Sequence, residues 1–192
     1  MKARNFIALA AAAFLLSACI PSVHPFYTDK NVVFEPRLLG EWQPKEDADK
    51  PETWKFEKGE ERTYKLTVME KEGRHGELSA RLFKLQEEYF LDLTPTDCKF
   101  ATNEAGLVTA AMFPGHLLMR VTQFEPGLKL AFCDYEWLEK HLEAKPNSLA
   151  HHKGEQRLVL TARTSDLQQF VLEHLGEDGL FQKPSEMVRK KN

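Results

Sequence analysis

The sequence predicts a mainly β fold: an antiparallel barrel-like or sheet-rich domain of about eight strands, with two short helices near the C-terminus. The first observation is that apolar and polar residues alternate with a period of two along many short segments, as in half-buried strands. The second is that turn signals separate several of these segments, among them Lys58-Gly59, Glu72-Gly73 and Glu125-Pro126-Gly127. A chain of 192 residues, 42% hydrophobic and 29% charged, is also long enough for one domain with its own core.

The predicted strands are short and closely spaced. A typical one places Tyr64, Leu66 and Val68 on one face and polar residues on the other. The alternation slips at Phe83, which predicts a bulge there. In chain order the predicted strands are 39–43, 53–57, 63–68, 77–82, 89–93, 117–121, 128–132 and 158–160.

Two helices follow most of the strands. Asp134 is a predicted N-cap for a helix from Tyr135 to about Glu143, which Pro146 ends. Ser165 and Gln168 form the pattern of a capping box for a second helix. The apolar stripe of this second helix is Leu167, Phe170, Val171 and Leu175, with Gly176 as its stop.

The N-terminus has the zones of a secretory signal. Lys2 and Arg4 form a positive start, and an unbroken apolar run follows from Phe6 to Leu16. This run is too short to span a bilayer, which needs about 20 residues. The segment Leu16-Ser17-Ala18-Cys19 resembles the lipobox of bacterial lipoproteins. The resemblance implies that Cys19 receives a diacylglyceryl group, becomes the new N-terminus and is acylated there, for example with palmitate.

This interpretation divides the chain into three parts. Residues 1–18 are the expected signal peptide, 19–31 a lipid-anchored tether and 32–192 a single mainly β domain. Pro21 and Pro25, without any periodicity around them, are the reason for predicting a tether. The protein is expected outside the cytoplasm, held to the bilayer through acylated Cys19. Ile20 is not the Asp that resembles an inner-membrane retention signal, which favours the outer membrane where the source has two.

The charge balance gives no indication of nucleic-acid binding. The formal net charge is −3, or −5 once Lys2 and Arg4 are removed with the signal peptide. Nucleic-acid binders usually carry a basic surface. The basic cluster Arg189, Lys190 and Lys191 is predicted to be a solvated tail.

Lipidation of Cys19 leaves Cys98 and Cys133 in the domain. In an oxidising compartment these two form a disulfide, or they stay as two separate thiols. The alternation of strand 128–132 places Cys133 on the opposite face from Leu128, Leu130 and Phe132.

Gly40-Glu41-Trp42, at the head of the first predicted strand, resembles the Gly-x-Trp signature of the lipocalin and calycin group. The resemblance implies an eight-stranded barrel closed at one end by Trp42. The Arg that packs on this Trp in that group has no identifiable position in the sequence, and two late helices exceed the single helix of a simple lipocalin. Trp42, Trp54 and Phe56 are either plain core or the lining of an apolar pocket.

A second resemblance spans more of the chain. Four segments are similar, in the same order, to segments of uncharacterised bacterial lipoproteins. They are His24-Pro25-Phe26-Tyr27, Leu38 to Trp42, Ala80 to Leu85 and Phe90-Leu91-Asp92. The likeness agrees with the lipoprotein interpretation and implies no activity.

Known catalytic motifs are absent from the sequence, which has no Gly-x-Ser-x-Gly, P-loop, dinucleotide fingerprint or His-Glu-x-x-His. His151 and His152 are expected in a solvated loop from Ser148 to Glu155, and as neighbours they would point to opposite faces of a strand, so no metal site is assigned to them. His116 and His141 lack a partner at ligand spacing and are expected on a strand and on a helix surface.

Asp92, Asp97 and Cys98 lie close together in the sequence, and an acid beside a thiol suggests a catalytic pair. Cys98 would need a base such as His116 to act as a nucleophile, and Asp97 is expected to initiate a turn instead.

We therefore expect no cofactor, metal or catalytic residue, and an enzyme ranks last among three functions. The first is an envelope protein that acts by contact with envelope partners. The second is a carrier of a small apolar ligand.

Overall fold

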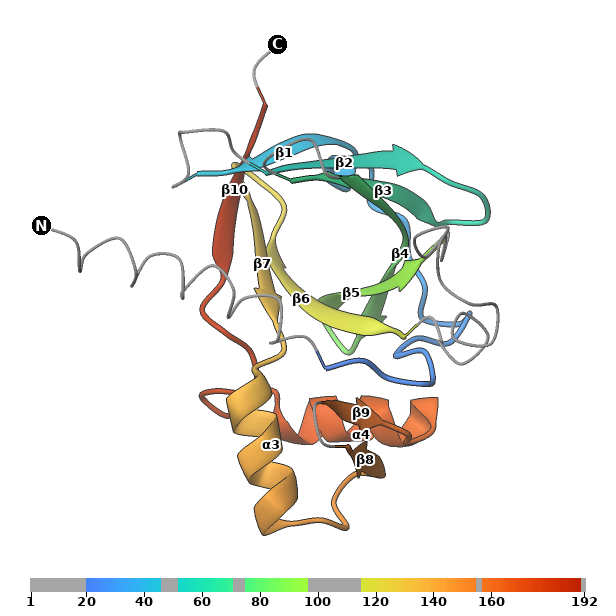
Figure 1. The fold of residues 1–192 in the computed structure, drawn as a ribbon. Helices are drawn as coiled ribbons and strands as arrows, with labels where there is room; N and C mark the ends of the chain where they lie inside the picture. Colours follow the sequence, from blue (N-terminus) through green and yellow to red (C-terminus); the bar gives the residue numbers. More distant parts are fainter. Residues whose placement is uncertain (1–19, 46–51, 71–74, 97–114, 155–156, 191–192) are drawn as a thin grey trace, which may run out of the picture.

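A computed structural model of the chain describes residues 20–45, 52–70, 75–96, 115–154 and 157–190. Eight antiparallel strands close into a barrel, and the two helices lie in the C-terminal part (Figure 1). The mainly β fold class predicted from the sequence is confirmed.

Around the barrel the order is β1-β10-β7-β6-β5-β4-β3-β2, so neighbours in the chain are mostly neighbours in the sheet. The last strand, β10, closes the barrel by pairing with both β1 and β7. The eight strands are β1 (Gly40–Pro44), β2 (Thr53–Lys58), β3 (Tyr64–Met69), β4 (His75–Leu85), β5 (Glu88–Pro95), β6 (Leu117–Gln123), β7 (Leu128–Phe132) and β10 (Ser185–Arg189).

Seven of the eight predicted strands belong to the barrel. The eighth prediction, residues 158–160, is a strand but lies outside the barrel. Residues Leu158–Leu160 form β9, which pairs with β8 (His151–Lys153) in a separate two-stranded sheet. The barrel is closed instead by β10, where Met187 is the one buried residue. A strand with a single buried side chain shows no alternation, so the period-two pattern does not reveal it.

The barrel interior is packed with apolar side chains. The alternating residues of each strand point inward, and Trp42 and Phe56 are 0% and 1% exposed. Such dense interdigitation is how a small eight-stranded barrel fills its own lumen. The buried side chains of this barrel core are Leu38, Trp42, Phe56, Tyr64, Leu66, Ala80, Leu82, Leu91, Leu93, Met119, Val121, Phe124, Leu128, Leu130 and Met187.

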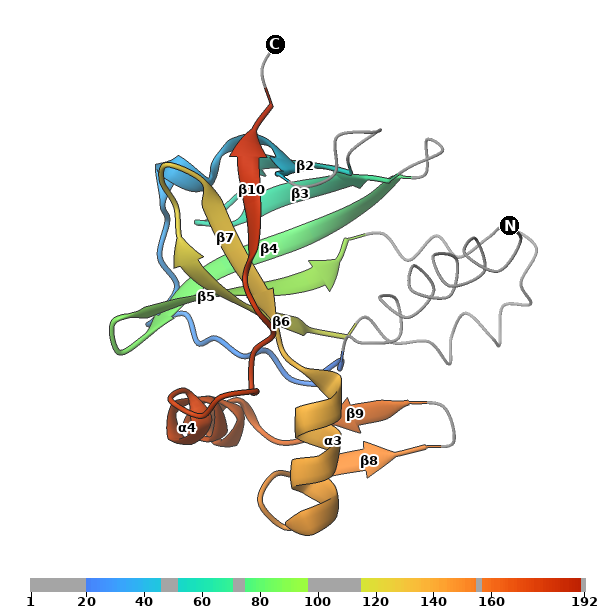
Figure 2. The ribbon, with the colours of Figure 1, turned by 90° about the vertical axis from the view of Figure 1, so that its left-hand side faces the viewer.

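A second layer packs beneath the barrel (Figures 1 and 2). It consists of α3 (Tyr135–Ala144), α4 (Thr164–His174) and the β8–β9 hairpin. Among the described residues, no helix combines the length and the apolar character needed to cross a bilayer. A second core, the interlayer core, lies between the layers and contains Ile20, Phe26, Phe83, Leu85, Phe90, Leu118, Leu138, Leu142, Leu149, Leu158, Leu160, Ala162, Leu167, Phe170, Val171 and Leu180.

The interlayer core explains the slip in alternation at Phe83. The predicted bulge there is wrong, because β4 pairs with β5 in continuous register through Phe83 and Phe90. Both side chains point away from the barrel interior and are buried by the second layer. The register shift lies elsewhere, between Val121 and Gln123 of β6.

The two helices differ in how well their starts are predicted. Asp134 caps α3 as expected, since its carboxylate accepts from the Trp137 N–H at 2.9 Å. The capping box at Ser165 and Gln168 is wrong: α4 begins at Thr164, and Arg163 makes no side-chain cap. The Gln168 amide donates instead to the backbone of the N-terminal segment, at the Phe26 carbonyl.

Residues 20–31 differ from the tether that the prolines indicate. Ile20 and Phe26 are buried in the interlayer core, and the segment runs between the barrel and the second layer (Figure 2). Its backbone is paired on both sides. The Ser22 N–H donates to the His116 carbonyl, and the Val23 N–H donates to the Leu160 carbonyl, each at 2.9 Å. These pairings are with residues far along the chain, so they leave no local pattern in the sequence.

Trp42, Gly40 and Arg189 close one end of the barrel. The Arg189 guanidinium lies 4.3 Å from the Trp42 ring centroid and donates to the backbone carbonyls of Leu39 and Arg37 at 2.9 Å each. The expectation of a solvated tail is therefore wrong for Arg189, whose side chain stacks on the indole. Gly40 has a φ of +122°, and a Cβ there would lie 2.6 Å from an Arg189 guanidinium nitrogen.

We predict that Gly40→Ala destabilises the protein by about 1–3 kcal/mol, because alanine strains the backbone at this φ and displaces Arg189. Urea unfolding followed by tryptophan fluorescence measures the change. Gly76→Ala is the matched control, since an added Cβ there has nothing within 4 Å. Equal stability of the two variants would contradict this account of the barrel end.

Candidate functional site

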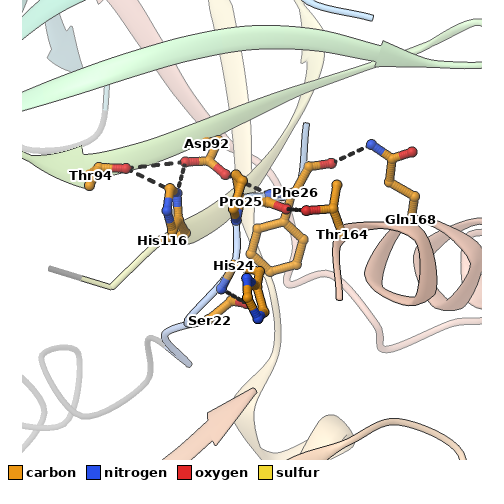
Figure 3. A network of polar contacts seen from close by, with 9 residues as sticks. All are labelled: Ser22, His24, Pro25, Phe26, Asp92, Thr94, His116, Thr164 and Gln168. Carbon is orange, nitrogen blue, oxygen red and sulfur yellow. Dashed lines mark hydrogen bonds and ion pairs between the residues drawn. The ribbon is translucent and has the colours of Figure 1, made fainter. Parts of the chain in front are cut away.

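Among the described residues, Asp92 is the one charged side chain that is fully buried. Asp92 lies on the outer face of β5, between the inward-facing Leu91 and Leu93, and is 1% exposed. One of its oxygens accepts from the Phe26 N–H at 2.8 Å. The other is 2.7 Å from the His116 Nδ1 and accepts from the Thr94 hydroxyl at 3.3 Å (Figure 3).

The second layer holds the same backbone segment from the opposite side. The Thr164 hydroxyl donates to the Pro25 carbonyl at 2.7 Å, and the Gln168 amide donates to the Phe26 carbonyl at 2.8 Å (Figure 3). The barrel therefore binds the N–H of Phe26 while α4 binds its carbonyl. We call Phe26, Asp92, His116, Thr164 and Gln168 the Asp92 network.

Chemically, Asp92 and His116 form a carboxylate–imidazole pair in which the carboxylate is buried and the imidazole is 16% exposed. An ionised carboxylate only accepts hydrogen bonds, so the pair places a proton on Nδ1 and directs Nε2 away from Asp92. In enzymes this arrangement orients a general base. Here the nearby hydroxyl, that of Thr94, lies 3.1 Å from the same Nδ1 rather than from Nε2. Within the described part of the chain the pair has no nucleophile, and what it does is hold the N-terminal segment.

The predicted reaction partners of His116 are only partly described. Cys98 and Asp97 lie outside the described residues. The structure brings His116 to Asp92, which the sequence had grouped with Cys98, and also to Thr94, which it had not. Phe26 and Asp92, which are hydrogen-bonded here, belong to two of the lipoprotein-like segments. Those segments were the sequence feature that could have indicated this contact.

Of the three cysteines, Cys133 is the one that lies within the described residues. Cys19 lies outside the described residues, as does the Cys98 side of the predicted disulfide. Cys133 is partly buried against the interlayer core, and its backbone bridges to Phe181. The pairing of Cys98 with Cys133 stays a prediction.

No group of three metal-ligating side chains occurs within the described ranges. His151 and His152 lie on β8 rather than in a loop, where neighbouring residues point to opposite faces. The His151 Nδ1 lies 2.8 Å from its own chain's Leu149 carbonyl.

Of the aromatic residues predicted as core or pocket lining, Trp42 and Phe56 are core, and Trp54 is partly buried against them. Trp42, Trp54 and Phe56 all face the barrel interior, and the Trp54 and Phe56 rings lie 6.3 Å apart. Two cavities among the described residues lie outside the barrel. One, between the layers, holds only about 20 Å³, room for about one water molecule. The other is an open, charged cleft of about 390 Å³.

His141 is not the helix-surface residue that its sequence position suggests. Its ring stacks on Trp137 at 4.9 Å and lies 4.5 Å from the His174 ring, centroid to centroid. Its Nε2 atom is buried without a hydrogen-bond partner. Burial, and next the nearby His174, lower the pKa of His141.

Comparisons with protein-family models, with curated proteins and with solved structures returned no match to this chain. Any functional assignment therefore rests on the geometry of the chain itself.

We predict that Asp92→Ala destabilises the protein by about 2–4 kcal/mol, because it leaves the Phe26 N–H and the His116 ring without their buried acceptor. Urea unfolding measures the loss, and limited proteolysis should then cut within residues 20–31. Asp178→Ala, at an exposed carboxylate, is the control and should change stability by no more than about 0.5 kcal/mol. Resistance of residues 20–31 to protease in Asp92→Ala would show that the network does not hold this segment.

We also predict a loss of stability as the pH falls below about 6.5 that depends on His141. The unfolded chain takes up a proton at the ordinary histidine pKa of 6.5, whereas the folded chain resists protonation until lower pH. His141→Phe keeps the ring stack and removes this titration, so it should lose less stability than the wild type between about pH 7.5 and 5.5. His152→Gln, an exposed histidine, should follow the wild-type curve. Parallel curves for wild type and His141→Phe would refute the assignment.

Proposed function

We propose that this chain is a lipid-anchored bacterial envelope protein that acts by contact, as an accessory or structural protein. The observation that carries the proposal is the filled barrel. Its inward side chains occupy the space in which a barrel-type carrier would hold a ligand. With no catalytic grouping in the described residues, the outer surface is what remains available for function.

The anchor rests on the signal-like residues 1–18 and on the resemblance of Leu16-Ser17-Ala18-Cys19 to a lipobox. Two acylated positions on Cys19 would hold the protein firmly, whereas a single chain binds only marginally. The bilayer and envelope proteins are the proposed partners. The outer membrane is the proposed location where the source has two membranes, since Ile20 follows the cysteine.

The seating of Ile20 gives this proposal a geometric consequence. Consecutive Cα atoms are about 3.8 Å apart, so Cys19 is within one residue of a side chain that is 5% exposed. A lipid on Cys19 would therefore hold the body close to the bilayer without a flexible spacer. The surface around the entry of residues 20–23, beside His116 and Leu160, would face the membrane.

The alternative, a lipocalin-like carrier, has support from one feature. Gly40, Trp42 and Arg189 close the barrel end in the way that the Gly-x-Trp resemblance implies, and Arg189 supplies the packing that had no position in the sequence. The tightly packed interior argues against a ligand there. Native mass spectrometry of the protein from its own envelope extract separates the two functions: a bound apolar species would favour the carrier, and an empty mass the contact role.

We predict that Cys19→Ala abolishes fatty-acid labelling and yields a protein that is either uncleaved or soluble in the extracytoplasmic space. Metabolic labelling with an alkyne fatty acid and membrane fractionation measure this. The fold should be unchanged, because Ile20, the first of the described residues, keeps its buried side chain. A variant that labels and fractionates like the wild type would refute the anchor.

The contact role is tested by inserting a flexible Gly/Ser spacer of about ten residues between Cys19 and Ile20. The lipid anchor remains in this variant, but the body is released from the bilayer. We expect photo-crosslinks from residues 23 and 24 to lipid to be lost, while fatty-acid labelling stays at the wild-type level. Unchanged crosslinking would show that the body does not rest against the membrane.

A further inference from the structure

A charged cleft opens on the outer surface of the barrel, where the N-terminal segment crosses β4 and the turn between β2 and β3. It is lined by Asp29, Val32, Glu61, Arg62 and Arg81 and has a volume of about 390 Å³. Sites for small molecules span roughly 300–1,000 Å³, so the cleft has room for a ligand at the small end of this range. The Asp92 network and the filled barrel leave this cleft without an assigned role.

Arg81 supplies the first cation. It lies on the outer face of β4, and its guanidinium is 5.1 Å from the Tyr27 ring centroid. Its register partner across the sheet is Asp92, but that carboxylate is occupied by His116 and Phe26. No carboxylate in the described part of the chain forms an ion pair with Arg81.

Arg62 supplies the second cation from a constrained turn. Glu61 and Arg62 have φ angles of +44° and +63°, a conformation unfavourable for residues with a Cβ. The Arg62 guanidinium reaches the N-terminal segment and donates to the carbonyl of Val32 at 2.8 Å and to that of Asp29 at 3.4 Å. An arginine has five N–H donors, so most of its donors stay available, and it too has no ion-pair partner among the described carboxylates.

Asp29 and Glu61 add two carboxylates to the same lining. Both side chains are exposed, and neither is paired with Arg62 or Arg81. The two carboxylates would repel a purely anionic ligand, and the two arginines would repel a purely cationic one. A ligand that carries both charges matches the lining on both sides.

We propose that this charged cleft binds a small zwitterion of the phosphoethanolamine class, with the phosphate at Arg62 and Arg81 and the ammonium group at Asp29 and Glu61. Guanidinium groups match phosphate oxygens through paired N–H donors. The same chemistry occurs in a free phosphoethanolamine and in a phospholipid headgroup. The proposal is independent of whether Cys19 carries a lipid.

The test is calorimetric titration of the full-length chain, solubilised in mild detergent, with O-phosphoethanolamine. We expect saturable binding, weaker binding of inorganic phosphate, and a loss of roughly tenfold or more in affinity for Arg81→Gln. Arg157→Gln, an exposed arginine of the second layer, is the matched control and should bind like the wild type. Absence of saturable binding, or equal affinity in Arg81→Gln, overturns the proposal.

Asp29→Asn tests the ammonium side separately. The Asp29 side chain makes no hydrogen bond within the described residues, so this variant should fold normally. We expect it to bind O-phosphoethanolamine and inorganic phosphate with nearly equal affinity. A preference as large as that of the wild type would refute the zwitterion assignment.

Vesicles distinguish the two sources of the ligand. The soluble form of the Cys19→Ala chain, without residues 1–18, is mixed with phosphatidylcholine vesicles that contain or lack phosphatidylethanolamine. Binding that needs both phosphatidylethanolamine and Arg81 supports the headgroup as ligand, whereas equal binding to both vesicles, with calorimetric binding retained, supports a soluble zwitterion. Failure of lipidation in the anchor experiment leaves these titrations unaffected.

Discussion

The buried carboxylate of Asp92 is the interaction on which the arrangement of the two layers depends. A carboxylate removed from water is costly unless its oxygens accept hydrogen bonds. Two of its donors come from parts of the chain far from β5: a backbone N–H of residue 26 and the ring of His116. The charge is therefore satisfied only when the N-terminal segment lies across the barrel wall.

The position of this segment then determines how the second layer attaches. Its carbonyls at Pro25 and Phe26 accept from Thr164 and Gln168, so α4 is aligned by the same stretch of backbone that Asp92 holds. Ile20 and Phe26 meanwhile fill part of the interlayer core. The segment therefore connects the barrel to the helices, because its backbone is hydrogen-bonded to side chains of both layers (Figure 3).

The sequence predicted what depends on local pattern and missed what depends on distant partners. Alternation located seven barrel strands, and Asp134 located the start of α3. By contrast β10, with Met187 as its one buried residue, carries no periodic signal. Gln168 has the spacing of a capping residue, but its amide finds a better partner in a carbonyl 142 residues away in sequence.

The candidate site was less predictable than the fold, for the same physical reason. Trp42 and Phe56 were placed on the correct face by parity, but whether they line a cavity depends on side-chain volumes from all eight strands. The sequence places Arg189 in a basic tail, whereas in the structure the pairing of β1 with β10 brings its side chain over Trp42. Arg62 and Arg81 share a cleft only because the N-terminal segment crosses β4.

A filled barrel and a fixed N-terminal segment together limit what this protein can do. The interior cannot respond to a ligand without displacing side chains such as Trp42, which is fully buried. Events at the surface are different, because the charged cleft and the end that we propose to be anchored both include parts of residues 20–33. A ligand that bridges Asp29 and Arg62 would add contacts to the same segment that begins at the proposed lipid anchor. If the proposed ligand and the proposed anchor both exist, occupancy of the cleft would add to the stability of the proposed membrane-facing segment, because both include the same stretch of backbone.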